Sequence, residues 1–253
     1  MTPAAVSMVV VAVVFGGSIL AMSVARLLPP SHLSAEAKDV IKLGMALVAT
    51  LVALVLSLMI ATAKSTYDAQ TAAVRQLSAD VLLLDRTLAE YGPDSQSSRA
   101  LLRQSAELIL GYLWPADGSA PASLAPGEAR GPSEFLLREV TDLSPHSPTQ
   151  EFLKAQALHL LSDMAQVRFN MYIQGTTELP PPFIIIVIIW LMILFSGYGL
   201  IAARNPTVIL VIFAATLSVS GAVFLIQELA TPFQGMMRVS SDPLREVIAQ
   251  LGV

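Results

Sequence analysis

Cysteine is absent from this chain of 253 residues, and its absence removes several kinds of site at once. Without a thiol there is no disulfide, no thiolate metal site and no cysteine nucleophile. Charge is also scarce, because only 13% of the residues are charged and the net charge is -4 at pH 7. No basic run occurs, and a nucleic-acid surface needs clustered Lys and Arg to neutralise phosphates. The sequence therefore argues against a nucleic-acid-binding protein.

Apolar residues, in contrast, are in excess. They make up 54% of the chain, and the mean hydropathy is +0.65, which is more apolar surface than a soluble fold of this size normally needs. The excess is unevenly distributed. Most charged residues fall between Lys64 and Glu178, and four other blocks are almost free of charge. This segregation predicts membrane spans joined to a water-exposed domain.

Four segments are long enough to span a membrane. A helix needs about 20 mostly apolar residues to cross a hydrocarbon core of about 30 Å. The predicted spans are residues 4–27, 41–63, 183–202 and 208–226. The first lacks a positively charged leader and exceeds the usual apolar core of a secretory signal, so we expect it to be retained. The third and fourth are separated only by residues around Arg204-Asn205-Pro206, which predicts an antiparallel hairpin.

The segment between the second and third spans reads as a set of amphipathic helices. Apolar residues recur at helical spacing over residues 64–91, 97–114, 134–140 and 151–174, and Gly92-Pro93 should end the first of these. Residues 116–133 are rich in Gly, Pro, Ala and Ser and predict a loop. The last part of the chain, residues 232–251, mixes apolar and basic positions and suits a segment at the membrane interface or packed under the spans.

We therefore predict an all-α integral membrane protein with four transmembrane helices and a helical extramembrane domain between spans 2 and 3. The predicted parts are residues 1–63 (spans 1 and 2), 64–182 (helical domain), 183–226 (span hairpin) and 227–253 (amphipathic tail). An even number of spans places both termini and the domain on one side. Lys and Arg are almost equally frequent near the span ends on the two sides, so charge bias does not identify that side.

One face of the second span carries small and polar residues at steps of three or four. We call it the small-residue stripe: Ala46, Ala49, Thr50, Ala53, Ser57, Ala61 and Lys64. Small residues allow membrane helices to approach closely, so packing alone would explain it. Alternatively, Thr50, Ala53, Ser57, Ala61 and Lys64 line the pore of an oligomer, where hydroxyls and a ring of ammonium groups suit anions. The two interpretations are compatible, because one edge of the stripe can pack while the other faces the axis.

Glu228, at the end of the fourth span, is the other candidate functional residue. A carboxylate at membrane depth is costly and suggests a function, whereas one turn of register would make it a solvated helix end. The sequence leaves both open. The three histidines lack ligand spacing, and no phosphate-binding loop, nucleophile elbow or convergent acid and base set is present. We therefore predict no enzyme, no metal site and no cofactor.

Several strings resemble one family, that of the bacterial bestrophin-like domain proteins, which share their architecture with bestrophin chloride channels. The resemblance covers nearly the whole chain from the second span onward. It is carried by Leu84-Asp85-Arg86-Thr87-Leu88, Tyr91-Gly92-Pro93, Arg99, Leu102-Arg103, Leu179-Pro180, Trp190-Leu191, Ala203-Arg204-Asn205, Ser218 to Leu225, Glu228-Leu229, Pro232-Phe233, Gly235, Arg238-Val239-Ser240-Ser241 and Pro243-Leu244-Arg245. The last stretch, from Ser218 to Arg245, is the most specific.

The resemblance implies a homo-oligomer, with a pentamer favoured, because bestrophins are pentameric chloride channels whose second span lines the pore. It further implies a multi-pass protein of the bacterial inner membrane, with termini and helical domain in the cytoplasm. The leading hypothesis is thus an anion channel in the lipid bilayer that conducts small anions such as chloride. The alternative is a membrane-anchored scaffold or sensor that binds a partner through its helical domain.

Overall fold

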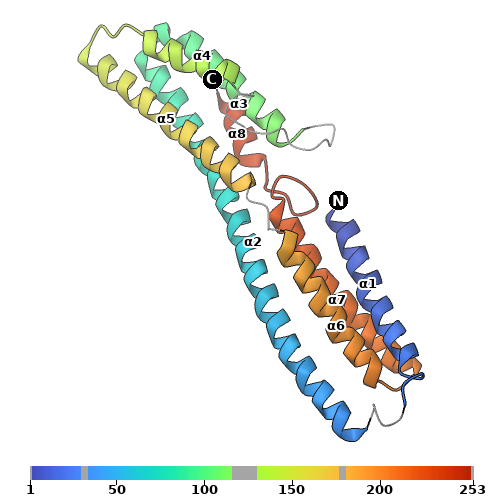
Figure 1. The fold of residues 1–253 in the computed structure, drawn as a ribbon. Helices are drawn as coiled ribbons and strands as arrows, with labels where there is room; N and C mark the ends of the chain where they lie inside the picture. The colour runs from blue at the N-terminus through green and yellow to red at the C-terminus, as the bar shows by residue number, and fades with distance from the viewer. Residues whose placement is uncertain (1, 30–33, 116–129, 177–180, 252–253) are drawn as a thin grey trace. The chain divides into compact units, whose positions relative to one another are not determined.

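The protein was analysed as a computed structural model, which describes residues 2–29, 34–115, 130–176 and 181–251. These residues are almost entirely helical and contain no strand (Figure 1). In chain order the helices are α1 (Pro3–Val24), α2 (Ala35–Tyr91), the 3₁₀ turn η2 (Pro93–Ser95), α3 (Gln96–Leu113), α4 (Arg130–Asp142), α5 (Pro148–Thr176), α6 (Pro181–Ile201), α7 (Pro206–Ala230) and α8 (Asp242–Gln250). Four of them, α1, α2, α6 and α7, are long and apolar enough to cross a membrane. The predicted all-α class with four long apolar helices is confirmed.

The chain divides into two compact units. The span unit comprises Met1–Ser65 and Glu178–Ala230, and the helical unit comprises Thr66–Thr177 and Thr231–Val253. Helix α2 contributes its first half to the span unit and its second half to the helical unit. The residue boundaries proposed from the sequence stay a prediction.

Helix α2 is one continuous helix, as its periodicity predicted. Its 57 residues correspond to a length of about 86 Å. A hydrocarbon core of about 30 Å holds only about 20 of them, so the rest of the helix has to extend beyond the core. The helix ends at Tyr91 because Gly92 adopts a φ of 116°, and Pro93 follows it. A side chain would strain that backbone, whereas glycine adopts it freely.

Helix α7 begins at a well-formed cap. The side-chain Oδ1 of Asn205 accepts a hydrogen bond from the backbone N–H of Val208 at 2.8 Å, and Pro206 occupies the first turn. Asparagine at the cap followed by proline is a favoured helix start, because both leave few unsatisfied donors. The predicted hairpin of spans 3 and 4 thus turns through residues 202–205.

Within the span unit, α1 packs along α6 and α7 (Figure 1). Gly199 of α6 lies against the backbone of Ser18 on α1, so closely that a Cβ at this position would collide with the Ser18 carbonyl oxygen. On the α7 side, the Ser220 hydroxyl donates to the carbonyl of Ser7 at 2.7 Å. Small residues and hydroxyl bonds are the usual means by which membrane helices associate.

The helical unit has a single apolar core. It is built from the second half of α2 with α3, α4, α5 and α8, and its fully buried members include Leu77, Val81, Leu84, Leu88, Leu102, Leu136, Val140, Ala157 and Leu244. The amphipathic faces predicted from the sequence meet here. Gln70 of α2 also donates from its side-chain nitrogen to the carbonyl of Met171 on α5, at 3.0 Å.

One local prediction was wrong. Residues 130–133, predicted as loop, form the start of α4, where Pro132 is tolerated because a first helical turn has no partner for its N–H. The remaining loop residues, 116–129, lie outside the described residues. Part of the predicted amphipathic tail belongs to the helical unit. Val239, Leu244, Val247, Ile248 and Leu251 are buried in its core, whereas Met236 and Met237 are exposed. The position of the tail relative to the membrane stays a prediction.

Candidate functional site

The first half of α2 presents three faces, which follow from a rotation of about 100° per residue. The packed face, Met45, Val52 and Met59, is buried within the span unit. The small-residue stripe lies roughly 140° around the helix axis from the packed face, in one direction. A leucine face lies roughly 140° around in the other, and its members are Leu43, Leu47, Leu51, Leu54 and Leu58.

The packed face holds α2 against the rest of the span unit. A Cβ added to Gly197 of α6 would run into the side chain of Met45, so these two helices touch there. Further along, Met59 shares with Ile184 and Val187 of α6 the wall of a cavity of only about 10 Å³. A space of this size is at the lower limit for one water molecule. This face is therefore packed closely within the span unit.

The predicted pore-lining residues are exposed in the described part of the chain. Thr50, Ala53, Ser57, Ala61 and Lys64 are exposed, and only Ala49 of the stripe is half-buried. The single chain thus leaves the stripe available for an axial pathway or for a neighbouring subunit. It also leaves the leucine face available, since Leu47, Leu54 and Leu58 are 64 to 67% exposed.

The hydroxyls of the stripe differ in what they offer an anion. The Oγ1 of Thr50 donates its proton to the carbonyl of Ala46 at 2.9 Å, so that donor is already used by the helix. Among the described residues, Ser57 forms no hydrogen bond through its side chain. Its O–H can therefore turn toward an ion without breaking a bond in the protein. Ser57 is the better anion donor of the two.

Lys64 is an exposed residue at the end of the span unit. Asp68 follows four residues later, which places the carboxylate one helical turn away on the same side of α2. The field at this position is therefore the sum of a positive and a negative group. Its sign in an oligomer depends on which of the two lies nearer the axis.

Glu228 is a buried acidic residue. It is only 3% exposed, and α7 continues past it to Ala230. A carboxylate in such a position is stabilised only where it has hydrogen-bond partners or shares a proton. Its side chain is thus shielded by the protein, and its depth relative to the membrane stays a prediction. Its functional role stays a prediction.

A cluster of cations missed as a site by the sequence reasoning lies in the span unit. Arg26, Lys38 and Arg204 line a cavity of about 370 Å³ near the ends of α1 and α6. The Arg204 Nη2 donates to the Ser23 Oγ at 2.6 Å, which ties the α6–α7 link to the end of α1. Lys38 is seven residues before Met45 and so belongs to the packed face, away from the stripe. These residues come from distant positions, and their only sequence signal is that each flanks a span.

Together, the four apolar helices and the amphipathic helical unit define a multi-pass, all-helical membrane protein. Comparison with known proteins gives its family. The family model for the Bestrophin-like domain matches residues 12–244, so this chain belongs to the bestrophin-like family. No curated protein matches the chain significantly in sequence.

Solved structures show the same fold. A crystal structure of a bacterial bestrophin homologue from Klebsiella pneumoniae, carrying one point mutation, matches with a TM-score of 0.69 at 13% identity and covers 96% of this chain and 97% of its own. A second point mutant of that homologue matches with a TM-score of 0.66 at 13% identity and covers 97% of each chain. The recognition made from the sequence motifs is confirmed. The chain therefore has the bestrophin fold over nearly its full length.

Proposed function

We propose that this protein is a homo-oligomeric anion channel, in which the small-residue stripe of α2 lines the pore. The observation that carries the proposal is the pattern of burial on α2: the packed face is buried, whereas Thr50, Ala53, Ser57 and Ala61 are exposed in a helix whose length and composition suit a membrane span. An exposed polar stripe inside a membrane needs either water or a neighbouring subunit beside it. A ring of subunits supplies both.

The leucine face then lies toward lipid or toward the adjacent subunit. Its side chains lose nothing in hydrocarbon, because lipid tails are as apolar as leucine. The stripe, in contrast, has hydroxyl groups that gain hydrogen bonds in a hydrated pathway. This difference supports placing the stripe, rather than the leucine face, at the axis. In a pentamer, the number favoured by the bestrophin resemblance, Ser57 and Lys64 would each occur five times around the pore.

Chloride and other small anions are the proposed permeant ions. A dehydrating anion needs O–H or N–H donors, and Ser57 provides one in each subunit. Passive conduction needs no catalytic group and no cofactor, which agrees with the lack of a convergent acid and base set in the sequence. The protein acts in this proposal as a pathway and not as an enzyme.

The proposed location is the bacterial inner membrane, with both termini and the helical unit in the cytoplasm. Reporters fused after Val253 and inserted at Gly118, a position outside the described residues, should both report the cytoplasmic side. Reporters on opposite faces would contradict four spans. Reporters that both face outward would leave the four spans intact and reverse the orientation.

Ion flux in liposomes tests the channel directly. Purified protein should release chloride or nitrate, and Ser57→Leu should reduce that release, because a bulky apolar side chain narrows or dewets the path. The variant also excludes a contaminating channel as the source of flux. An intact oligomer that passes no anion over a range of pH and voltage would contradict the proposal and favour the alternative, a membrane-anchored scaffold or sensor.

A further inference from the structure

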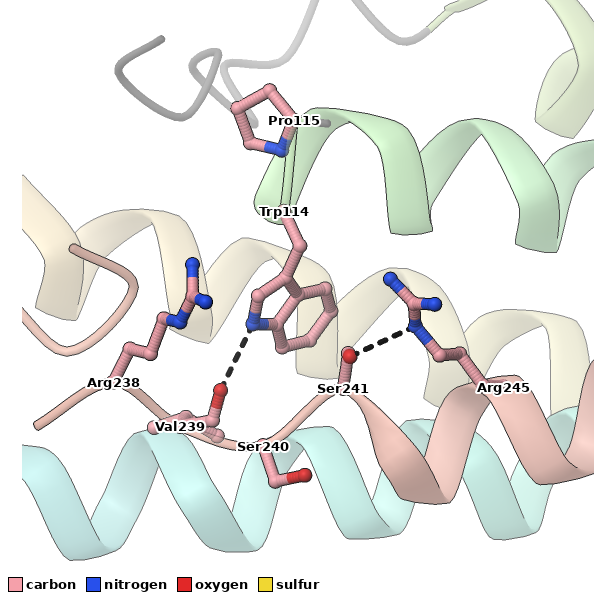
Figure 2. Close-up of a pocket in the computed structure, with 7 residues that line it drawn as sticks. All are labelled: Trp114, Pro115, Arg238, Val239, Ser240, Ser241 and Arg245. Atoms are coloured by element: carbon pink, nitrogen blue, oxygen red, sulfur yellow. Dashed lines mark hydrogen bonds between the residues drawn. The ribbon is translucent and has the colours of Figure 1, made fainter. Parts of the chain in front are cut away.

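Another cavity, of about 440 Å³, lies within the helical unit (Figure 2). We call it the Trp114 cavity. It is lined by Trp114 and Pro115, which follow α3, and by Arg238, Val239, Ser240, Ser241 and Arg245, which lie before and at the start of α8. The second group belongs to the most specific part of the family resemblance, and the channel proposal gives it no role.

The wall formed by Trp114 is held in place from two sides. The Trp114 indole Nε1 donates to the carbonyl of Val239 at 2.9 Å. Its ring also packs edge-to-face on Phe233, with 5.5 Å between the ring centroids. Val239 in turn is buried in the core of the helical unit. Trp114 therefore gives the cavity one flat aromatic wall that the fold holds in place.

Two guanidinium groups face this cavity. Arg238 makes no hydrogen bond or ion pair with any other described residue. Arg245 donates from Nε to the Ser241 hydroxyl at 2.9 Å, which orients its guanidinium and leaves both Nη groups available. Figure 2 shows the two arginines on either side of the Trp114 ring. Two positive charges beside one cavity repel each other, and an anion bound between them would attract both and offset that repulsion.

The serines complete a set of donors. The Ser240 hydroxyl is already used, because it donates to the carboxylate of Asp242 at 2.6 Å and accepts from the Asp242 N–H. The Ser241 hydroxyl accepts from Arg245, and so its own O–H remains to donate. Ser241 is also the first residue before α8 and does not cap that helix with its side chain. The carboxylate of Asp242 lies in the first turn of α8 and offsets the partial positive charge of the helix start, so the two arginines are the positive groups of the site.

We propose that the Trp114 cavity binds a phosphate-bearing anion through Arg238, Arg245 and the Ser241 hydroxyl. Arginine presents planar pairs of N–H donors that match the oxygens of a phosphate, and such charge-assisted bonds are stronger than neutral ones. The volume is far larger than a halide needs, so the occupant is not the proposed permeant ion. Space remains for an organic group against the indole wall. The phosphate belongs either to a soluble metabolite or to a lipid headgroup.

Tryptophan fluorescence gives a direct readout of this site. The chain has two tryptophans, Trp114 and Trp190, so the variant Trp190→Phe leaves the cavity residue as the only fluorophore. Inorganic phosphate, titrated at constant ionic strength into the full-length protein in detergent, should give a saturable change in Trp114 emission. Sodium chloride at the same ionic strength should give none.

Variants of the two arginines identify the donors. Arg238→Gln and Arg245→Gln should each raise the dissociation constant about tenfold or more, as expected for the loss of a charge-assisted hydrogen bond. Arg138→Gln is the matched control, because Arg138 is an exposed arginine of the same unit that does not line the cavity. Both cavity arginines are exposed, so their replacement should leave the fold intact.

Reconstitution then separates the two sources of phosphate. If a lipid headgroup is the ligand, bilayers that contain phosphatidic acid should shift the Trp114 emission before any inorganic phosphate is added, and should abolish the response to inorganic phosphate. Bilayers of pure phosphatidylcholine should have neither effect. If the ligand is soluble, the response should be the same in both bilayers. A Trp114 signal that ignores phosphate in detergent and in bilayers, or that persists when both arginines are replaced, would overturn the proposal. Because the readout is binding, failure of the channel proposal leaves this test unchanged.

Discussion

The guanidinium of Arg99 on α3 forms a two-pronged ion pair with the carboxylate of Asp85 on α2. Its Nε lies 2.7 Å from Oδ1, and its Nη2 lies 2.9 Å from Oδ2. The Asp85 side chain is only 7% exposed and that of Arg99 23%. The hydrogen bond to Asp85 raises the pKa of Arg99 above its ordinary value, so the arginine stays charged. The pair ties together two helices of the core on either side of the turn at Gly92.

Removal of one partner should destabilise the helical unit strongly. Arg99→Leu leaves the buried Asp85 carboxylate without its counterion, and breaking a buried pair in this way costs about 3–5 kcal/mol. Glu107→Ala is the control on the same helix, because its pair with Arg103 is about half exposed and should contribute only a few tenths of a kcal/mol. Thermal unfolding of the full-length protein in detergent measures both. Equal shifts in the two midpoints would contradict this account.

Asp80 should make the stability of the helical unit depend on pH. Burial raises the pKa of its carboxyl above the ordinary 3.8, the nearby charge of Asp163 raises it further, and a hydrogen bond from Gln76 partly opposes the shift. The folded protein therefore holds this proton at a pH where the unfolded chain has lost it. Stability from this group increases as the pH falls through the raised pKa toward 3.8, and is lost as the pH rises through the same window.

Asp80→Asn tests that sign. The amide keeps an acceptor for Gln76 and removes the buried charge, so the variant should unfold at a higher temperature than the wild type at pH 7, and the difference should shrink near pH 4. The exposed Asp142→Asn is the control and should show no such trend. A difference that grows as the pH falls would have the wrong sign for a raised pKa.

Gly199 should tolerate no side chain. A Cβ there would collide with the carbonyl oxygen of Ser18, which is backbone and cannot rotate away. Gly199→Ala should therefore lower the unfolding temperature by separating α1 from α6. At Gly16, where nothing lies within 4 Å of the added Cβ, the same change should be neutral or slightly stabilising, because alanine favours the helix. Identical effects of the two variants would place the close contact elsewhere.

Lys64 should influence ion preference if the stripe faces the axis. Lys64→Glu adds a negative ring beside the carboxylates of Asp68, and should lower anion over cation permeability. The effect should be largest at low ionic strength, because exposed charges are screened over a Debye length of about 8 Å at physiological salt. Asp68→Asn should shift the preference in the opposite direction. Reversal potentials in bilayers at two salt concentrations measure both, and unchanged potentials would remove this end of α2 from the pathway.

Much of the fold could be predicted because the apolar content of a segment and the spacing of its apolar residues are local signals. The runs without charge gave the four spans, and the leucines between Leu77 and Leu88 gave the continuation of α2. The destination of the tail could not be predicted. An amphipathic helix such as α8 suits a membrane interface or a protein core equally well, and only the partners of Leu244 in the folded chain decide between them.

The sites show the same limit. The stripe on α2 is visible in the sequence because its residues share one helix, although spacing alone does not say whether the stripe packs or faces water. The Trp114 cavity could not be predicted, because Trp114 and Arg238 are separated by more than a hundred residues and meet only in the folded helical unit. Glu228 was recognised from its place at a span end, but its burial depends on surrounding helices.

Three neighbouring residues test the central claim most directly, because Ser57, Leu58 and Met59 lie at nearly the same depth on the three different faces of α2. The wild-type chain has no cysteine, so each can be replaced by cysteine in a background that does not react. In liposomes, a charged thiol reagent should label Ser57→Cys and change anion flux. Leu58→Cys should stay unlabelled because it faces lipid or a neighbouring subunit, and Met59→Cys should stay unlabelled because it lies on the packed face. Labelling and a flux change at Leu58→Cys instead of Ser57→Cys would place the leucine face on the axis and contradict the account.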